Sequence, residues 1–317
     1  MTRMREERGE FLAKLKAYEP PTREPEGEVE EPARAKTNGN GKPHDFGQGE
    51  RLRFRVRFAK RGVMTLTGHL DLVRALPRIM RRAGIQAYYT EGFHPKPMLE
   101  FAPPLPLGVE SLGEYVDVSL REDMAVEELL QSLNAHAPVG IEFLTARRLE
   151  PGAPKLARVL AAAEYVVRVD AEHLAGFDEE FLDHAPERFM ARTEASLAVV
   201  RKRKQKTVDI RPAVQTVGWI SAADLPPELD FARPEARYLL VRGLLGAEVH
   251  ARPEEVATCV LGGDPGFEAV HIARTRLILK PEATMTREKL PEITELPESE
   301  LDSCRPSSPT RGPALQH

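Results

Sequence analysis

The stretch that decides the fold covers residues 51–58 and reads Arg51-Leu52-Arg53-Phe54-Arg55-Val56-Arg57-Phe58. Apolar side chains alternate with arginines, and this period of two residues predicts a β-strand. Successive side chains of a strand point to opposite sides, so the apolar set shares one face and the four arginines share the other. The sequence therefore predicts a strand with a core face and a basic face.

The residues after this strand predict a helix over 69–83, because Leu72, Leu76, Ile79 and Met80 recur at helical spacing. Gly84 is placed to end the helix, and Pro77 is expected to kink it. Further patterns predict strands over 98–102, 114–120 and 139–149, and a second helix around 126–133. The order strand-helix-strand-strand-helix-strand is that of a ferredoxin-like unit.

The second half of the chain repeats this order with other residues. Strands are predicted over 164–169, 197–201, 207–210, 214–220, 238–241 and 270–279, with helical segments over 181–193 and from residue 253. We therefore predict an α+β fold of two tandem ferredoxin-like (βαββαβ) units, the second one decorated. The expected domains are 51–150 and 151–280. Residues 1–50 and 281–317 are expected to be disordered tails, because they are rich in polar residues and proline and carry few large apolar side chains.

The composition narrows the functional classes. The chain has 317 residues, a net charge of −4 and only two cysteines, Cys259 and Cys304. Two distant cysteines cannot build a structural zinc site or ligate an iron–sulfur cluster, so no metal is expected in this chain. The longest uncharged run, residues 212–223, is too short to span a membrane. No secretory signal precedes the fold, and a cytoplasmic location is expected.

Several short motifs, taken together and in order, resemble one family. They are Gly68-His69-Leu70-Asp71-Leu72-Val73-Arg74, Arg81-Arg82-Ala83-Gly84, Glu91-Gly92-Phe93-His94-Pro95-Lys96-Pro97, Pro104-Leu105-Pro106-Leu107-Gly108-Val109-Glu110-Ser111, Asp209-Ile210-Arg211-Pro212 and Ala273-Arg274-Thr275. The chain resembles, over residues 52–279, the radical-SAM-linked (radical-SAM-associated) proteins, a bacterial domain of unknown function. It departs from that family at Gly68, where the family has serine, and at Pro77, where the family continues a helix.

The resemblance implies a context rather than a reaction. In that family the domain is encoded beside, or fused to, a radical SAM protein with a cobalamin-binding-type domain, often near genes for a ribonuclease of the E/G type and ribosomal proteins. S-adenosylmethionine, an iron–sulfur cluster and cobalamin are accordingly expected on the partner, with no cofactor in this chain. The family-motif candidates for a site are His69, Asp71, Arg74, Glu91, Gly92, Phe93, His94, Lys96, Asp209, Arg211 and Arg274.

The basic face is the strongest physical signal for a partner. Residues 51–82 contain ten Lys or Arg and one acid. A positive surface binds phosphate backbones, so the nucleic-acid candidates are Arg51, Arg53, Arg55 and Arg57 on the strand and Arg201, Lys202, Arg203 and Lys204 at a predicted hairpin tip. Two alternatives remain open. Neighbouring Glu100, Glu114 and Asp117 would neutralise the strand face by pairing, and the hairpin tip would be a solvated turn.

Two motif groups also allow two interpretations each. His69, Asp71 and Arg74 would contact an anion at a helix N-terminus, or Asp71 would cap that terminus and pair with Arg74. The loop 91–97 would recognise a ligand, or it would be a turn pinned onto the core by Phe93. A metal site from His69, Asp71 and His94 has no diagnostic spacing.

The function predicted from these features is that of a non-catalytic accessory protein. It would bind RNA, either tRNA or ribosomal RNA, and present it to a partner radical SAM enzyme. No nucleophile elbow, Walker loop or His-Glu-x-x-His motif occurs, and Cys259 lies on the apolar stripe of a predicted helix. A metal-independent RNA-processing enzyme and a protein–protein scaffold remain as alternatives.

Overall fold

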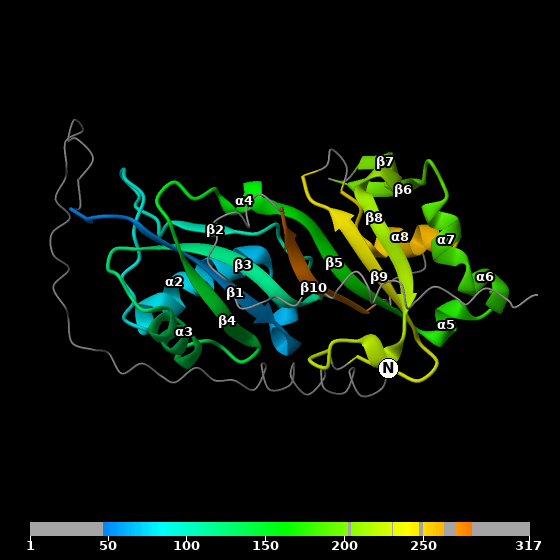
Figure 1. The fold of residues 1–317 in the computed structure, drawn as a ribbon, viewed down its shortest axis with the longest axis horizontal. Coiled ribbons are helices and arrows are strands. Elements are labelled where there is room, and N and C mark those ends of the chain that lie inside the picture. Colours follow the sequence, from blue (N-terminus) through cyan, green and yellow to red (C-terminus); the bar gives the residue numbers. More distant parts are fainter. Residues whose placement is uncertain (1–46, 202–203, 230, 247–249, 263–270, 281–317) are drawn as a thin grey trace, which may run out of the picture. The chain divides into compact units, whose positions relative to one another are not determined.

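The computed structural model describes residues 47–201, 204–229, 231–246, 250–262 and 271–280 (Figure 1). These residues form a mixed α+β fold around one large sheet, so the predicted fold class is confirmed at this level. The two predicted disordered tails, 1–50 and 281–317, lie outside the described residues except for residues 47–50. The division into domains at residue 150 stays a prediction.

The first half of the fold contains four strands and two long helices. In chain order its elements are β1 (Leu52–Lys60), the 3-10 helix η1 (Gly62–Leu66), α2 (His69–Arg82), β2 (Leu99–Phe101), β3 (Glu110–Leu120), α3 (Val126–Ala135) and β4 (Ile141–Leu149). The strands lie in the order β4-β1-β3-β2, and each neighbouring pair is antiparallel. Helix α2 continues through Pro77, and Gly84 follows its end with a positive φ of 73°, as a helix C-terminus favours.

The second half contains more and shorter elements. They are α4 (Leu156–Val159), β5 (Leu160–Val169), α5 (Ala171–Leu174), α6 (Glu179–Asp183), α7 (Ala185–Met190), β6 (Ser196–Arg201), β7 (Lys204–Asp209), η2 (Arg211–Ala213), β8 (Val214–Ile220), η3 (Ala222–Asp224), β9 (Arg237–Leu244), α8 (Pro253–Val260) and β10 (His271–Leu279). Strands β10-β5-β9-β8 lie side by side and are antiparallel, while β6 and β7 form a separate hairpin.

Strand β3 joins the two halves into one eight-stranded sheet. Its later residues pair with β1 and β2, and its first two residues pair with β10, Glu110 with Ala273 and Ser111 with Arg274. The β3–β10 pairing is parallel, unlike the others in this sheet. The strand begins at Glu110, four residues before the predicted start, and this extra length makes the join.

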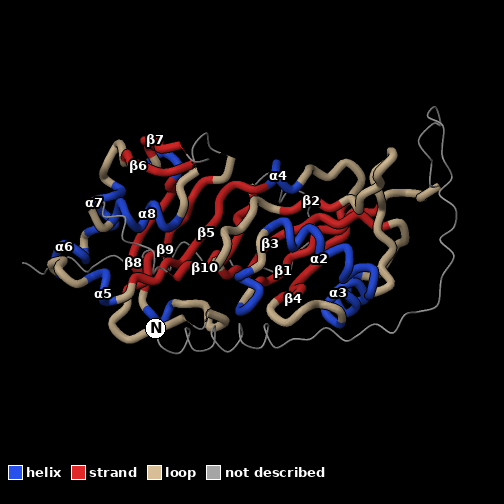
Figure 2. Tube along the Cα trace, turned by 180° about the vertical axis from the view of Figure 1, so that it is seen from behind, coloured by secondary structure: helices blue, strands red, loops and turns tan. Residues whose placement is uncertain are grey.

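Helices α2 and α3 cover one face of the first half (Figure 2). Phe54 and Val56 of β1 are fully buried there, in one cluster with Ile79 and Met80 of α2. The same face of the second half is covered by α7 and α8, where Val167 and Leu239 pack against Phe189 and Val256. The predicted apolar face of residues 51–58 is therefore the core face of β1.

The opposite face of the sheet is also covered near the join. The chain that leaves β4 crosses this face before it enters β5, and Leu156 and Val159 of α4 lie in one buried cluster with Tyr115. This crossing decides the surroundings of the β1 arginines, because they lie on the same face as Tyr115.

Candidate functional site

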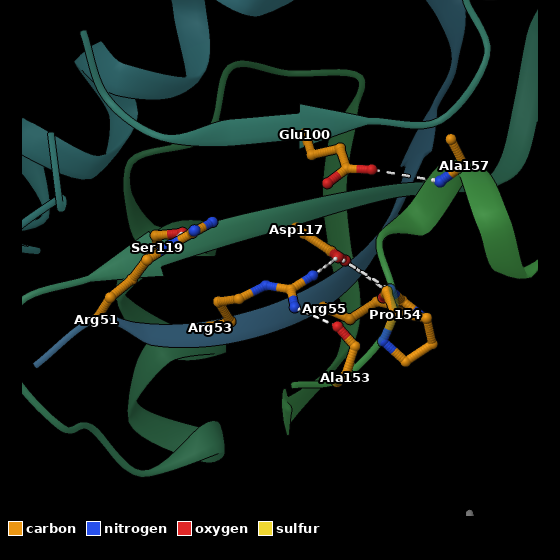
Figure 3. A network of polar contacts seen from close by, with 9 residues as sticks. All are labelled: Arg51, Arg53, Arg55, Glu100, Asp117, Ser119, Ala153, Pro154 and Ala157. Carbon is orange, nitrogen blue, oxygen red and sulfur yellow. Dashed lines mark hydrogen bonds and ion pairs between the residues drawn. The ribbon is translucent and has the colours of Figure 1, made fainter. Parts of the chain in front are cut away.

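Two arginines of β1, Arg53 and Arg55, are held by Asp117 on the neighbouring strand β3 (Figure 3). Arg55 donates from Nε to Oδ1 of Asp117 at 2.7 Å and from Nη2 to Oδ2 at 2.9 Å. Arg53 donates to the same Oδ2 at 3.0 Å. The Asp117 side chain is 4% exposed, and those of Arg55 and Arg53 are 8% and 15% exposed. One buried carboxylate thus binds two guanidinium groups.

Backbone carbonyls accept further hydrogen bonds from these cations. Arg53 donates to the carbonyl oxygen of Ala153 at 2.6 Å and Arg55 to that of Pro154 at 3.3 Å, both on the segment that crosses the face (Figure 3). Arg57 donates to the carbonyl of Leu112, and a Cβ at Gly113 would lie 2.7 Å from the Arg57 Nε. Gly113 therefore leaves the space in which this guanidinium lies.

The expectation of an open basic platform on β1 is wrong. Arg51 is exposed and bonds Ser119, but Arg53 and Arg55 are paired and covered. Of the three acids expected to neutralise this face, Asp117 alone does so. Glu100 accepts instead from the backbone N–H of Ala157. The physical reason is that residues 150–157 run across the face that a single ferredoxin-like unit would leave uncovered.

The third of these acids, Glu114, belongs to a buried cluster at the β3–β10 join. Arg274 of β10 is 2% exposed and donates from Nη1 to both carboxylate oxygens of Glu114, at 3.0 and 2.9 Å. Its Nε and Nη2 lie 3.2 and 3.1 Å from the hydroxyl oxygen of Tyr165, and Ser111 donates to Glu114 at 2.6 Å. The family-motif residue Arg274 thus fastens the two halves together.

A lysine that sequence reasoning passed over lies close to this cluster. Lys60, at the end of β1, is 1% exposed and donates from Nζ to the carbonyl of Thr67 at 2.8 Å. Burial lowers the pKa of Lys60; the Glu114 carboxylate opposes this effect and Arg274 adds to it. Lys60, Glu114 and His69 line a cavity of about 10 Å³, which has room for one water molecule and none for a substrate.

At the start of α2, Asp71 caps the helix and lies near Arg74, which is the second of the two interpretations of this motif. Asp71 accepts from the backbone N–H of Gly68 at 3.0 Å and lies 3.8 Å from the Arg74 guanidinium. The His69 ring packs edge-on against Phe101. Both contacts of the capping interpretation are therefore present.

The loop 91–97 is presented to solvent. Phe93 is 84% exposed, and His94 and Lys96 are exposed beside it. The loop is closed at its base, because Thr90 donates to the carbonyl of Lys96 at 2.8 Å and the Lys96 N–H donates to the Thr90 hydroxyl at 3.0 Å. The alternative of a turn pinned onto the core by Phe93 is wrong; Glu91 is exposed as well, and Gly92 has a positive φ of 116°.

The motif residues of the second half have structural partners. Asp209 accepts from the backbone N–H groups of Ala195 and Arg211. Arg211 donates to three backbone carbonyls, those of Met190, Arg192 and Val214. These bonds fix the ends of the β6–β7 hairpin against α7 and β8. In the hairpin, Arg201 pairs with Lys204 across the strands and Lys204 is exposed, while Lys202 and Arg203 lie outside the described residues.

The one cysteine among the described residues is part of the core. Cys259 is buried in the second core, where burial raises the pKa of its thiol, and Cys304 lies outside the described residues. No group of three or more His, Cys, Asp or Glu side chains that could hold a metal ion occurs in the described ranges. No helix among these residues is both long and apolar enough to cross a membrane.

Comparison with known proteins places this chain in a family. No curated protein matches this chain. A family model described as "Uncharacterized protein conserved in bacteria (DUF2344)" matches residues 53–239, from the second residue of β1 to the third residue of β9. The matched region is more than half of the chain and includes the Arg53–Arg55–Asp117 group, the start of α2 and the loop 91–97. The chain therefore belongs to the DUF2344 family of proteins conserved in bacteria.

Proposed function

We propose that this protein is a non-catalytic accessory protein that binds RNA, either tRNA or ribosomal RNA, and works with a partner radical SAM enzyme in RNA modification. The partner, with its S-adenosylmethionine, iron–sulfur cluster and cobalamin, enters the proposal through the family resemblance. The observation that carries the RNA part is the exposed loop 91–97, in which Phe93 is 84% exposed and the exposed Lys96 follows three residues later.

An exposed aromatic ring on a closed loop suits unpaired bases. Stacking of a base on an aromatic side chain contributes about 1–3 kcal/mol and needs a free ring face, which the exposure of Phe93 provides. Lys96 lies three residues away and is exposed, so its ammonium group can contact a phosphate. The Thr90–Lys96 bonds hold the loop closed before RNA arrives, which reduces the entropy lost on binding. The proposed RNA target is accordingly a single-stranded or loop region.

The architecture offers a second contact. Lys204 and Lys206 are exposed on the β6–β7 hairpin, in the other half of the fold. We further propose that the halves are tandem ferredoxin-like units, at 51–150 and 151–280. Support comes from their equivalent strand orders, β4-β1-β3-β2 and β10-β5-β9-β8, with every neighbouring pair antiparallel. The β6–β7 hairpin is then the decoration of the second unit.

Fluorescence anisotropy with labelled tRNA and with a single-stranded ribosomal RNA fragment tests the RNA part. Phe93→Ala should weaken binding by about 5- to 150-fold without changing the salt dependence, because stacking is not ionic. Lys96→Ala should reduce the slope of log K against log salt by about 0.7, the value for one phosphate contact on a single strand.

Val139→Ala is the matched control, since Val139 is 88% exposed and lies outside the loop. Equal affinities of wild type and Phe93→Ala, or no retention of either RNA at low salt, would refute RNA binding through this loop. Cleavage of the RNA in the presence of EDTA would instead identify a metal-independent RNA-processing enzyme.

A further inference from the structure

Exposed apolar side chains gather around η1 and the first turn of α2. Among the described residues, the large apolar side chains exposed there are Val63, Leu66, Leu70, Val73 and Leu107, at 58, 62, 67, 37 and 66%. Of the other three exposed large apolar residues, Phe93 and Leu244 lie elsewhere, and Val139 precedes Gly140, whose carbonyl accepts from the N–H of Arg61. A group of this kind on a protein surface marks an interaction site.

Hydrogen bonds bring these residues together. The N–H of Gly108 donates to the carbonyl of Thr65 at 2.8 Å, so Leu107 lies against η1, which carries Val63 and Leu66. Only Thr67 and Gly68 separate η1 from α2, where Leu70 and Val73 are one turn apart. We call this group the apolar end of the α2 surface; it consists of Val63, Leu66, Leu70, Val73 and Leu107.

The other end of the same helix is cationic. Arg74, Arg78 and Arg81 follow Leu70 at spacings of four, four and three residues, so they share its outward face, and Arg82 lies four residues beyond Arg78. All four are exposed. In the described part of the chain Arg78, Arg81 and Arg82 have no hydrogen-bond or ion-pair partner, and Arg74 has a distant one in Asp71 at 3.8 Å. We call Arg78, Arg81 and Arg82 the cationic end.

We infer that the α2 surface docks an acidic segment of a partner protein, with apolar side chains on the apolar end and carboxylates on the cationic end. Arginine forms bidentate bonds with carboxylates, and unpaired exposed arginines beside apolar residues match an occupant of this composition. The apolar end and the cationic end lie apart along a helix about 20 Å long. The apolar residues and the carboxylates of the occupant should therefore form two separate groups along its chain.

Other occupants fit the surface less well. RNA would use the arginines and leave the apolar end uncovered. In a symmetric pair of copies the same patch supplies both sides, and neither the apolar end nor the cationic end contains a carboxylate for the arginines. A helix on a membrane needs an apolar stripe along its whole length, and the apolar stripe of α2 is buried in the core through Leu76, Ile79 and Met80. This inference does not depend on RNA binding by the loop 91–97.

Site-specific photo-crosslinking in the full chain tests the surface. Benzoylphenylalanine placed at Leu70 should crosslink in cells to one protein, and mass spectrometry should map the bond to a segment in which apolar residues adjoin Asp or Glu. The same group at Leu244, an exposed apolar position on β9, is the control and should not give this product. The crosslinked protein is then purified and titrated against the full chain.

Binding of that protein should weaken at least tenfold in the triple variant Arg78→Gln, Arg81→Gln and Arg82→Gln, and at least tenfold in Leu66→Ser with Leu70→Ser. The triple Lys variant, which keeps the charges, should retain most of the affinity. Urea unfolding of each variant shows that the fold is kept. Crosslinks only to a second copy, to RNA or to lipid, no crosslink at all, or affinities that these changes leave unaltered, would overturn the inference.

Discussion

The cations of β1 and the cations of α2 come from one basic stretch, residues 51–82, yet they meet opposite surroundings. On β1, Arg53 and Arg55 are bound by the buried Asp117 and by backbone carbonyls. On α2, Arg78, Arg81 and Arg82 are exposed and have no partner in the described part of the chain. The difference teaches that clustered charge in a sequence identifies a binding surface only after the internal acids and the covering segments are known.

The largest effect of this contrast should be seen when Asp117 is removed. Asp117→Ala leaves two covered guanidinium groups without their carboxylate, so the free energy of unfolding should fall by about 3–5 kcal/mol. Urea denaturation measures it. Asp123→Ala is the matched control, since its partner Arg148 is half exposed, and it should cost at most about 1 kcal/mol. Equal losses in the two variants would remove the distinction between covered and solvated pairs.

A smaller effect should appear in the pH dependence of stability through Lys60. The pKa of this buried amine is lowered in the folded protein, so the unfolded chain binds its proton more strongly. Wild type should therefore gain stability relative to Lys60→Met as the pH rises from 7 toward 10.5, the ordinary pKa of lysine. Unfolding curves over this range test the sign. A stability difference that shrinks as the pH rises would contradict the lowered pKa of Lys60.

The smallest effect on stability is expected on α2. Changing Arg78, Arg81 and Arg82 together to Gln removes no hydrogen bond or ion pair seen in the described residues, and it relieves the repulsion between Arg78 and Arg82. The free energy of unfolding should change by no more than about 1.5 kcal/mol, since each of the three exposed substitutions costs about 0.5 kcal/mol or less. Thermal and urea unfolding check this. A large loss would show that these arginines are structural, like those of β1.

Much of the fold could be predicted from local patterns. The alternation over residues 51–58 and the apolar spacing in 69–83 give β1 and α2, because a strand and a helix each bury one regular set of side chains. The early start of β3 at Glu110 was missed, since Ser111 and Gly113 have no strand-like alternation. That start is stabilised by pairing with β10, more than 150 residues later, and no local pattern records such a partner.

The residue types of the candidate site could be predicted from the sequence. Which of these side chains are exposed to solvent was harder to predict. The loop 91–97 was singled out by its Gly, Pro, Phe, His and Lys, but only the structure shows that Phe93 faces solvent. Lys60 had a signal, because it continues the spacing of Phe54, Val56 and Phe58 toward the core. The hydrogen bond from Arg53 to the carbonyl of Ala153 could not be predicted, because every residue has a backbone carbonyl and the sequence does not show where it will lie.

The place of β10 has a consequence for the order of events during synthesis on the ribosome. The residues of the first half are made well before residues 271–279, which supply the partner strand for Glu110 and Ser111 and the guanidinium for Glu114. Until Arg274 emerges, Glu114 lacks the cation that accompanies its burial, so the edge of β3 must stay hydrated in the nascent chain. The two halves can therefore fold one after the other, but the β3–β10 pairing that joins them forms only after β10 has been synthesised.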